Sequence, residues 1–151
     1  MSKSKSAVLS CDNFSWDGVE KKIYKTETDN FRDIHRYTLL GDEHSELNSE
    51  TRYFEIQPDG YSSLEYHRHP HSVVIIRGSG SVILNDELHS IQSFDVVYIG
   101  PETIHQFHAD NGEELGFICV VDRYRDRPSI PDDDQIRNTI RSEKILKKIR
   151  K

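Results

Sequence analysis

The sequence predicts an all-β protein that folds as a single barrel with a short C-terminal helix. Short apolar runs separated by turn signals fill residues 36–124, a pattern typical of a sandwich or barrel. The chain has 151 residues, which suits one domain. Helical periodicity is confined to the end of the chain. We therefore expect an N-terminal polar extension over residues 1–35, the barrel over 36–124, and a C-terminal linker and helix over 125–151.

The N-terminal extension, residues 1–35, is polar with scattered aromatic side chains, and we expect it to lie along the outside of the barrel or of a partner subunit. Its apolar run from Ala7 to Leu9 is short, whereas a secretory signal needs about 7–15 apolar residues. The longest apolar run of the chain, residues 117–121, falls far short of the ~20 residues of a membrane helix. The expected location is therefore the cytoplasm.

Eight short strands, rich in β-branched and aromatic residues, are expected to form the barrel. Their ranges are 37–40, 52–56, 63–67, 73–77, 81–84, 96–99, 106–109 and 115–121. Segments 58–60, 85–86 and 110–112 combine Pro, Asp, Asn and Gly and suit tight reversals. The barrel interior should be small and partly apolar. Its expected wall residues are Phe54, Ile56, Val74, Ile76, Phe107 and residues 115–121.

The segment 131–151 predicts one helix. Pro131 suits a first helical position, and acidic residues at 132–134 precede a basic end, an order that complements the helix dipole. A thin apolar stripe runs along this segment and is formed by Ile136, Ile140, Leu146 and Ile149.

The net charge limits the classes of partner, and the cysteine content indicates the redox compartment. Twenty basic and 26 acidic residues give a formal net charge of −6, which disfavours general binding to nucleic acid or to an anionic membrane. The two cysteines, Cys11 and Cys119, do not make a disulfide framework, which fits a reducing compartment. Cys119 lies in an apolar strand, where the expected role is that of a buried structural thiol. A small molecule is the expected partner.

Four of the eight histidines fall where a metal site would need them. His67, His69 and His71 alternate, so on an extended strand their side chains share one face. At ~3.3 Å per residue the outer two lie ~13 Å apart, too far for one ion bound at ~2.1 Å, so the chain must bend at Pro70. His71 should then lie in a turn or at the start of the next strand. The fourth histidine, His105, opens a later strand after an apolar run and a Gly-Pro turn.

This pattern resembles the small single-domain cupins of the conserved-barrel (cupin-2) type, whose fold is a double-stranded β-helix, or jelly roll. That family carries a histidine pair between two glycines, an acidic ligand seven residues before the second glycine, and a later proline followed by a histidine. The matching residues are Gly60, His67, His69 and Gly78 for the first motif, and Pro101 and His105 for the second. His71 stands at the position of the acidic ligand.

The resemblance implies a divalent metal held by His67, His69 and His105, with His71 in place of the family's acidic ligand. The alternative is that the shortened gap after His69 turns His71 away and leaves three ligands. Imidazole ligands place Fe(II) and Zn(II) first, ahead of Cu, Ni and Mn. Glu65 shares the face of His67 and His69 by alternation, so it is a candidate to support a ligand or to act as a general base; otherwise it is a polar residue at the barrel mouth.

The function implied by the resemblance is that of a metal-dependent enzyme acting on a small molecule. Oxygenase-type chemistry, such as that of a dioxygenase, comes first, with isomerase or lyase chemistry as further outcomes. The alternative is a non-catalytic module that binds a metal or a small ligand. A metal-free structural barrel would leave four histidines in register unexplained. Small cupins commonly pair through their ends, so a homodimer is expected.

Overall fold

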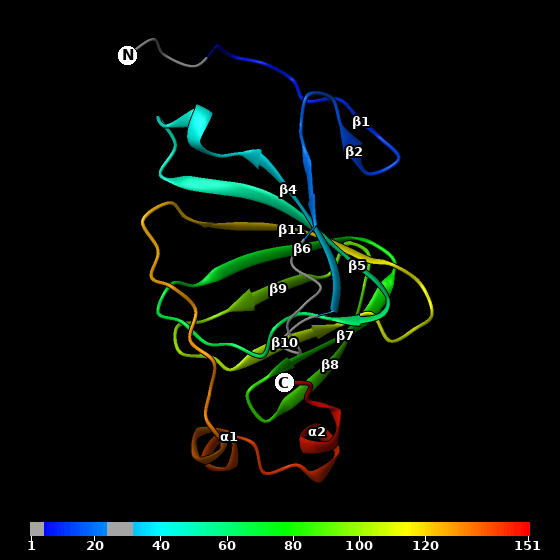
Figure 1. Cartoon of the computed structure of the whole chain (residues 1–151), viewed down its shortest axis with the longest axis vertical. Coiled ribbons are helices and arrows are strands. Elements are labelled where there is room, and N and C mark those ends of the chain that lie inside the picture. Colours follow the sequence, from blue (N-terminus) through cyan, green and yellow to red (C-terminus); the bar gives the residue numbers. More distant parts are fainter. Residues whose placement is uncertain (1–4, 24–31) are drawn as a thin grey trace.

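The β-branched runs of the sequence form one curled antiparallel sheet, and two short helices lie at one end of it (Figure 1). The computed structural model describes residues 5–23 and 32–151. In chain order the elements are β1 (Cys11–Asp12), β2 (Ser15–Trp16), β3 (Lys21–Ile23), β4 (Arg32–Leu40), a short 3-10 helix (Asp42–His44), β5 (Ser49–Tyr61), β6 (His71–Arg77), β7 (Ser79–Leu84), β8 (Glu87–Gln92), β9 (Val96–Ile99), β10 (His105–His108), β11 (Leu115–Asp122), α1 (Asp133–Thr139) and α2 (Glu143–Lys148).

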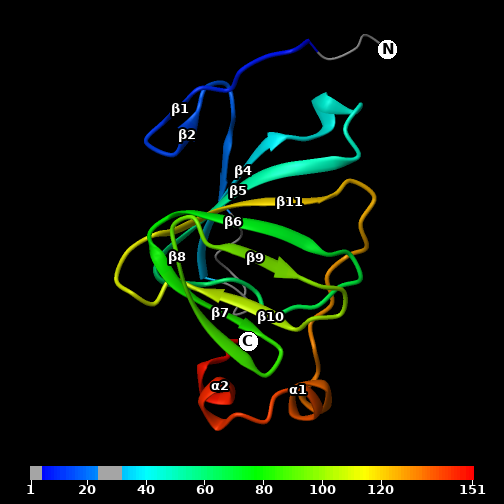
Figure 2. The same cartoon turned by 180° about the vertical axis from the view of Figure 1, so that it is seen from behind.

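The main sheet has the strand order β8-β7-β10-β5-β11-β6-β9, and β4 pairs with β5 and with β3. The strands at its two ends, β8 and β9, lie near each other (Figure 2). Side chains of β7, β8 and β9, among them Val82, Ser90 and Val97, jointly line a shallow cavity there. The predicted all-β class is therefore confirmed.

Within the described residues, no helix is long and apolar enough to cross a lipid bilayer.

The predicted strands are present with one exception. Residues 63–67 do not form a strand; Glu65 and Tyr66 make isolated bridges to His105 and Ser129 within an irregular connection between β5 and β6. The structure also contains strands that the prediction lacks. These are β1, β2 and β3 in the predicted extension, and β8, which pairs with β7 through a two-residue turn at Asn85. The alternation of β8 is hidden in its sequence because four of its six residues are polar or charged.

The predicted reversal at residues 58–60 is a bend inside β5. The strand pairs with β11 as far as Ile56 and with β10 at Tyr61. Asp59, between them, has a φ of 66°, in the left-handed region that Asp tolerates better than most residues. The chain thus keeps its direction and passes from one strand partner to another, which curls the sheet.

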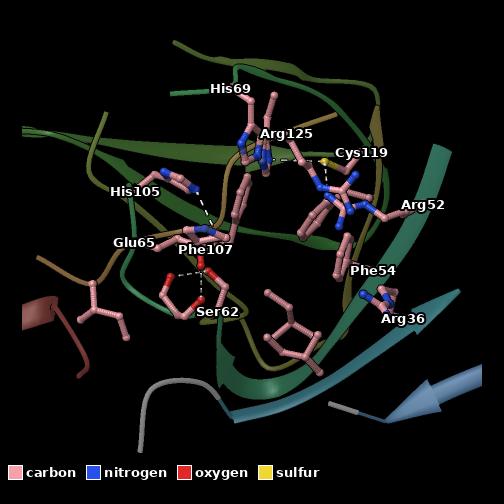
Figure 3. A pocket seen from close by; sticks show the side chains of 17 residues that line it. Arg36, Arg52, Phe54, Ser62, Glu65, His69, His105, Phe107, Cys119 and Arg125 are labelled. Atoms are coloured by element: carbon pink, nitrogen blue, oxygen red, sulfur yellow. Dashed lines mark hydrogen bonds and ion pairs between the residues drawn. The ribbon is translucent and has the colours of Figure 1, made fainter. Parts of the chain in front are cut away.

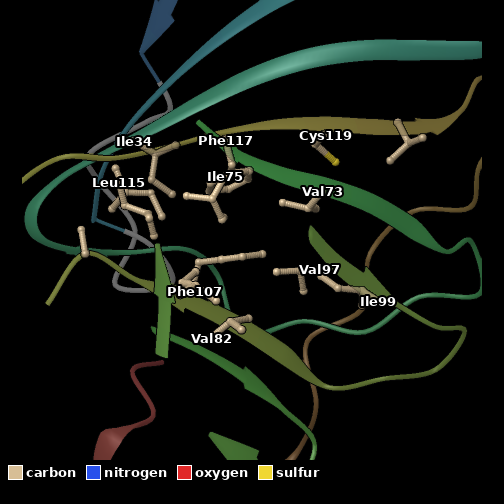
Figure 4. Close-up of a cluster of buried hydrophobic side chains, with 14 residues drawn as sticks. Ile34, Val73, Ile75, Val82, Val97, Ile99, Phe107, Leu115, Phe117 and Cys119 are labelled. Carbon is tan, nitrogen blue, oxygen red and sulfur yellow. The ribbon is translucent and has the colours of Figure 1, made fainter. Parts of the chain in front are cut away.

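The interior face of β6 differs by one residue from the prediction. Val73 and Ile75 are fully buried in the barrel core with Phe107 and Phe117 (Figure 4), whereas the predicted wall residues Val74 and Ile76 point to the opposite face. Both faces of β6 are apolar, so the sequence lacks the alternation that fixes which side faces inward. Phe54, Ile56 and Phe107 lie on the inner side as predicted.

The C-terminal helical segment is divided into two helices where one was predicted. The first, α1, begins at a capping box in which the Asp132 side chain accepts from the Gln135 backbone N–H. It ends at Ile140, whose backbone is extended. Asp86 then accepts hydrogen bonds from the backbone N–H groups of Arg141 and Ser142, and Ser142 caps α2. These competing hydrogen bonds end the first helix and start the second.

The two ends of the chain pack on different parts of the sheet. The β1–β2 hairpin places Phe14 and Trp16 against Tyr53 on the outer face, with ring centroids 6.1 and 4.9 Å apart. The helices bury Ile136 and Ile145 in a separate cluster with Ile83. Residues 24–31, in the predicted extension, lie outside the described residues.

Candidate metal centre

The irregular connection between β5 and β6 positions two of the four candidate histidines. Its Glu65 is bridged to the first residue of β10, His105, by backbone hydrogen bonds in both directions, of 3.2 and 3.0 Å. His67 and His69 follow in this connection, outside any strand, and His71 is the first residue of β6. The bend at Pro70 and the place of His71 agree with the sequence analysis; the strand expected under His67 does not form.

The structure brings all four imidazole rings together. The ring centroids of His67 and His69 are 3.7 Å apart and the rings are nearly parallel; His71 lies 4.5 Å and His105 4.9 Å from the His67 ring. The Nε2 atoms of His69 and His71 are 3.1 Å apart. Neighbouring ligand atoms in a tetrahedral site with metal–nitrogen bonds of ~2.1 Å lie about 3.4 Å apart, so this spacing suits a common ion.

Each ring has its Nδ1 atom engaged, which leaves its Nε2 atom for the centre. Nδ1 of His67 lies 2.7 Å from the His69 carbonyl oxygen, and Nδ1 of His105 lies 2.8 Å from the Thr103 carbonyl oxygen. Nδ1 of His69 meets the Asp126 carboxylate at 2.9 Å, and Nδ1 of His71 is 3.4 Å from the Cys119 sulfur. A partner on the far nitrogen fixes the orientation of a metal-binding imidazole.

The electrostatics of two of the rings, those of His67 and His71, favour the neutral form that binds metals. Burial, then the charge of His105, lowers the pKa of His67 to about 4. The same two causes, in the same order, lower the pKa of His71 to about 2. Both imidazoles are therefore neutral at neutral pH, and each retains a lone pair for coordination.

Glu65 joins the same group of side chains. One of its oxygens, Oε1, lies 4.0 Å from His67 Nε2 and 3.7 Å from His105 Nε2. The other, Oε2, accepts a hydrogen bond of 2.7 Å from the Ser63 hydroxyl. Burial favours the neutral carboxyl, but the hydrogen bond and charge of His105, with the Ser63 hydroxyl, outweigh it and lower the pKa of Glu65. The carboxylate is thus ionised beside the imidazoles.

The donor set fits a bound cation. Nε2 of His67 is buried and has no hydrogen-bond partner among the described residues, although an unsatisfied buried nitrogen is costly. The potential ligand atoms of His67, His69 and His71 all lie within 4.8 Å of one another, and so do those of Glu65, His67 and His105. Because His67 belongs to both groups, an ion bound to it would lie within reach of all of these side chains.

The imidazoles of His69, His71 and His105 face a cavity of about 480 Å³ inside the curled sheet. In Figure 3, His69, His105 and Glu65 lie on one side of this cavity, whereas Arg52, Arg125 and Cys119 lie on the other. Three phenylalanines, at positions 54, 107 and 117, line the space between them. A cavity of this size suits a metabolite.

The sequence pattern did not predict two residues of the site, Cys119 and Asp126. Cys119 is buried as predicted, but it also lines the cavity, 3.7 Å from Arg52 Nη2. Its position on the inner face of β11, in alternation with Phe117, could have placed it there. Asp126 lies 57 residues from His69 in the sequence, and no local pattern links the two.

Comparison with known proteins agrees with this description. The family model described as the cupin domain matches residues 52–121. The chain is 37% identical over 121 residues to 1-methylthio-D-xylulose 5-phosphate methylsulfurylase of Rhodospirillum rubrum, an alignment that covers 80% of this chain and 76% of that protein.

Two solved structures have the same fold. A cupin 2 conserved barrel domain protein from Rhodopseudomonas palustris superposes with a TM-score of 0.89 at 39% identity, covering 96% of this chain and all of that one. A cupin-2 domain protein from Rhodospirillum rubrum gives a TM-score of 0.79 at 34% identity, covering 87% of this chain and 88% of that one. The chain belongs to the cupin family of conserved-barrel proteins.

Proposed function

We propose that this protein is a metal-dependent enzyme that removes the methylthio group from a methylthio ketose phosphate. The observation that carries the proposal is a thiol, Cys119, in the same cavity as the imidazole cluster. The proposal is further supported by the 37% identity to a protein named for methylsulfurylase activity on 1-methylthio-D-xylulose 5-phosphate.

The metal would be held by His67, His69, His71 and His105 through their Nε2 atoms, with Glu65 beside them. These ligands favour Fe(II) or Zn(II), ahead of Cu, Ni and Mn. A divalent ion bound there supplies Lewis-acid stabilisation of negative charge on a ketone oxygen. Phe54, Phe107 and Phe117 give the rest of the cavity an apolar wall.

Cys119 is the residue that we assign to attack the substrate sulfur. A sulfur–sulfur bond forms between Cys119 and the methylthio group while the carbon–sulfur bond of the substrate breaks. The electron pair of the broken bond passes to carbon, and the proton given up by Cys119 is returned to that carbon, so a methyl ketone leaves. The two sulfur atoms are oxidised to a disulfide as the carbon is reduced. A low-molecular-weight thiol then takes up the methylthio group and restores Cys119.

Glu65 is the group that we assign to carry the proton. Its carboxylate is ionised and lines the cavity together with Cys119. It can therefore accept the thiol proton and release it to the carbon that has lost sulfur. The Ser63 hydroxyl, which donates to its far oxygen, holds the carboxylate in place.

The test is turnover of 1-methylthio-D-xylulose 5-phosphate by the metal-loaded chain with a small thiol. We expect loss of the methylthio group, and mass spectrometry should find that group on Cys119 when the small thiol is left out. Cys119→Ser should abolish turnover and keep the bound metal, whereas Cys11→Ser, at an exposed cysteine, should change neither. Unchanged turnover in Cys119→Ser would contradict the assignment.

The other functions expected from the sequence give different results in this assay. Oxygenase-type chemistry predicts O2 consumption that depends on Fe(II) and not on Cys119. A binding module predicts ligand binding without turnover. Cys119 in the cavity favours sulfur chemistry over both, because neither of them requires a thiol there.

A further inference from the structure

Guanidinium groups gather on the cavity wall that faces the imidazoles. Arg36, Arg52 and Arg125 line this wall, and Figure 3 shows them on the side of Cys119 and Phe54. Their positive charge has no part in the chemistry described above, although it is concentrated in a largely apolar cavity.

Arg52 is the most buried of the three. It lies on the inner face of β5, only 8% exposed, and its guanidinium carbon lies 5.0 Å from the centroid of the Phe54 ring. Its Nη2 atom donates a long hydrogen bond of 3.7 Å to the Cys119 sulfur. Its Nε atom is buried and has no hydrogen-bond partner in the part of the chain that the structure describes. Among the described residues, Arg52 forms no ion pair with a carboxylate. A buried cation with an unsatisfied donor is costly unless an anion binds it.

Two further arginines, Arg36 and Arg125, line the cavity beside Arg52. Arg36 lies opposite Phe54 across the β4–β5 pair, so it is a diagonal neighbour of Arg52 on the same face of the sheet. Arg125 is partly compensated, because its Nη2 atom lies 3.2 Å from Glu50 Oε2. Glu50 thus offsets part of the charge of Arg125.

We infer that this wall is a phosphate subsite in which Arg52 binds a phosphate monoester and Arg36 and Arg125 complete the positive wall. The planar, forked donors of arginine match phosphate oxygens, and a dianion suits a wall with more than one guanidinium. The inference rests on the proposed function only for the identity of the molecule that bears the phosphate.

The subsite also explains how a substrate would be oriented. Arg52 contacts Cys119, and Cys119 contacts His71, at 3.7 and 3.4 Å. A molecule bound by its phosphate at Arg52 would therefore lie in the same cavity as the thiol and the imidazoles. Binding energy from the phosphate would in this way position the reacting carbon–sulfur bond.

The first test is calorimetric titration of the full-length chain with inorganic phosphate, both metal-loaded and after chelation, so that binding to the metal is separated from binding to arginine. We expect phosphate binding in both forms. Arg52→Gln should weaken it at least tenfold, and Arg141→Gln should not change it. Arg141 is an exposed residue of the segment between the two helices, so its replacement removes the same charge. No binding by the wild-type chain, or equal binding by Arg52→Gln, would overturn the inference.

A second measurement does not depend on the folding of Arg52→Gln. The Arg52 Nε–H resonance of the wild-type chain, assigned by its absence in Arg52→Lys, should shift when phosphate is added. A resonance that stays fixed at saturating phosphate would also overturn the inference.

Kinetics separates failure of the subsite from failure of the proposed function. If the methylthio ketose phosphate is turned over, Arg52→Gln should raise its KM at least tenfold; an unchanged KM overturns the subsite and leaves the function intact. If the compound is not turned over but phosphate binding still depends on Arg52, the proposed function fails and the subsite stands.

Discussion

Asp126 lies outside the imidazole cluster and fixes the orientation of one of its rings, that of His69. Its carboxylate accepts from the backbone N–H groups of Arg68 and His69 at 2.9 and 3.0 Å, and it also contacts Nδ1 of the His69 ring. These hydrogen bonds, the backbone N–H of Arg68 first and then the His69 ring, lower the pKa of Asp126. The ionised carboxylate therefore keeps the proton of His69 on Nδ1 and the lone pair of Nε2 toward the centre.

Replacement of Asp126 by asparagine should weaken the metal site without unfolding the chain. The amide keeps the shape of the side chain but loses the charge that fixes the His69 tautomer. We expect metal affinity to fall by about 10–100-fold, the usual cost of losing such a support. Competition with a chelating dye measures the affinity. Asp134→Asn, at an exposed helical residue, is the charge-matched control and should leave the affinity unchanged. Equal affinities in the two variants would contradict this role of Asp126.

The residues of the candidate site were predictable to different degrees. His67, His69, His71 and His105 could be found because the spacing of three of them and the strand context of the fourth are local features of the sequence. Asp126 could not, since only the folded chain brings it to His69. Arg52 and Cys119 lie opposite each other on β5 and β11, a pairing that the sequence alone does not reveal.

At the scale of elements, a strand could be predicted more readily than its orientation. The apolar run of β6 identifies a strand, but only the fold decides that Val73 and Ile75 face the core. Similarly, the turn residues at 58–60 predict a reversal of the chain, whereas in the sheet they form a bend at Asp59 within β5. Pairing partners far apart in the sequence determine both outcomes.

Strand β10 links the barrel to the C-terminal helices through side chains on its outer face. Gln106, fully buried, donates to the carbonyl oxygens of Ser62 and Arg150 and accepts from the Arg150 backbone N–H. His108, two residues on, is 6% exposed and lies 2.9 Å from the Gln106 side-chain oxygen. The end of α2 is thus fixed by a buried polar pair.

The burial of His108 should make the stability of the protein, freed of metal by a chelator, depend on pH. Burial, then the charge of Lys148, lowers the pKa of His108 to about 4, with Asp110 opposing and Arg150 assisting. The unfolded chain, with an ordinary histidine pKa of about 6.5, therefore binds a proton between about pH 6.5 and 4 that the folded chain does not bind. The stability that neutral His108 gives the folded chain is fully present above about pH 6.5. As the pH falls from there to about 4, the free energy of unfolding decreases by about 1.4 kcal/mol per pH unit.

Urea unfolding at pH 7.5 and 5.0 measures this effect. The loss of unfolding free energy between the two pH values should be about 2 kcal/mol smaller in His108→Gln than in the wild-type chain. His89→Gln removes an exposed histidine and should behave like the wild type. The same pH dependence in His108→Gln and wild type would show that another group is responsible.

At the scale of the whole molecule, some strands of the curled sheet are covered by other elements and others are exposed. The outer face of β4 and β5 is covered by the β1–β2 hairpin, and the outer side of β7 and β10 is covered by the helices (Figures 1 and 2). Within the part of the chain that the structure describes, strand β9, at one end of the sheet, is not covered in this way. Phe94, just before it, and Val96 and Tyr98 within it are 82%, 71% and 68% exposed.

The stripe of Phe94, Val96 and Tyr98 is where we expect a second copy of the chain to bind. Large apolar side chains side by side on an edge strand are a liability in a monomer, and a shallow cavity of about 290 Å³ adjoins them. Sedimentation should therefore detect a dimer. Val96→Lys should shift it to a monomer while the circular dichroism spectrum is retained, because a lysine there would place a charge in the interface. Val8→Lys, at an exposed valine of the N-terminal segment, should leave the dimer intact. A wild-type monomer would contradict dimer formation, and a dimer of Val96→Lys would place the interface elsewhere on the molecule.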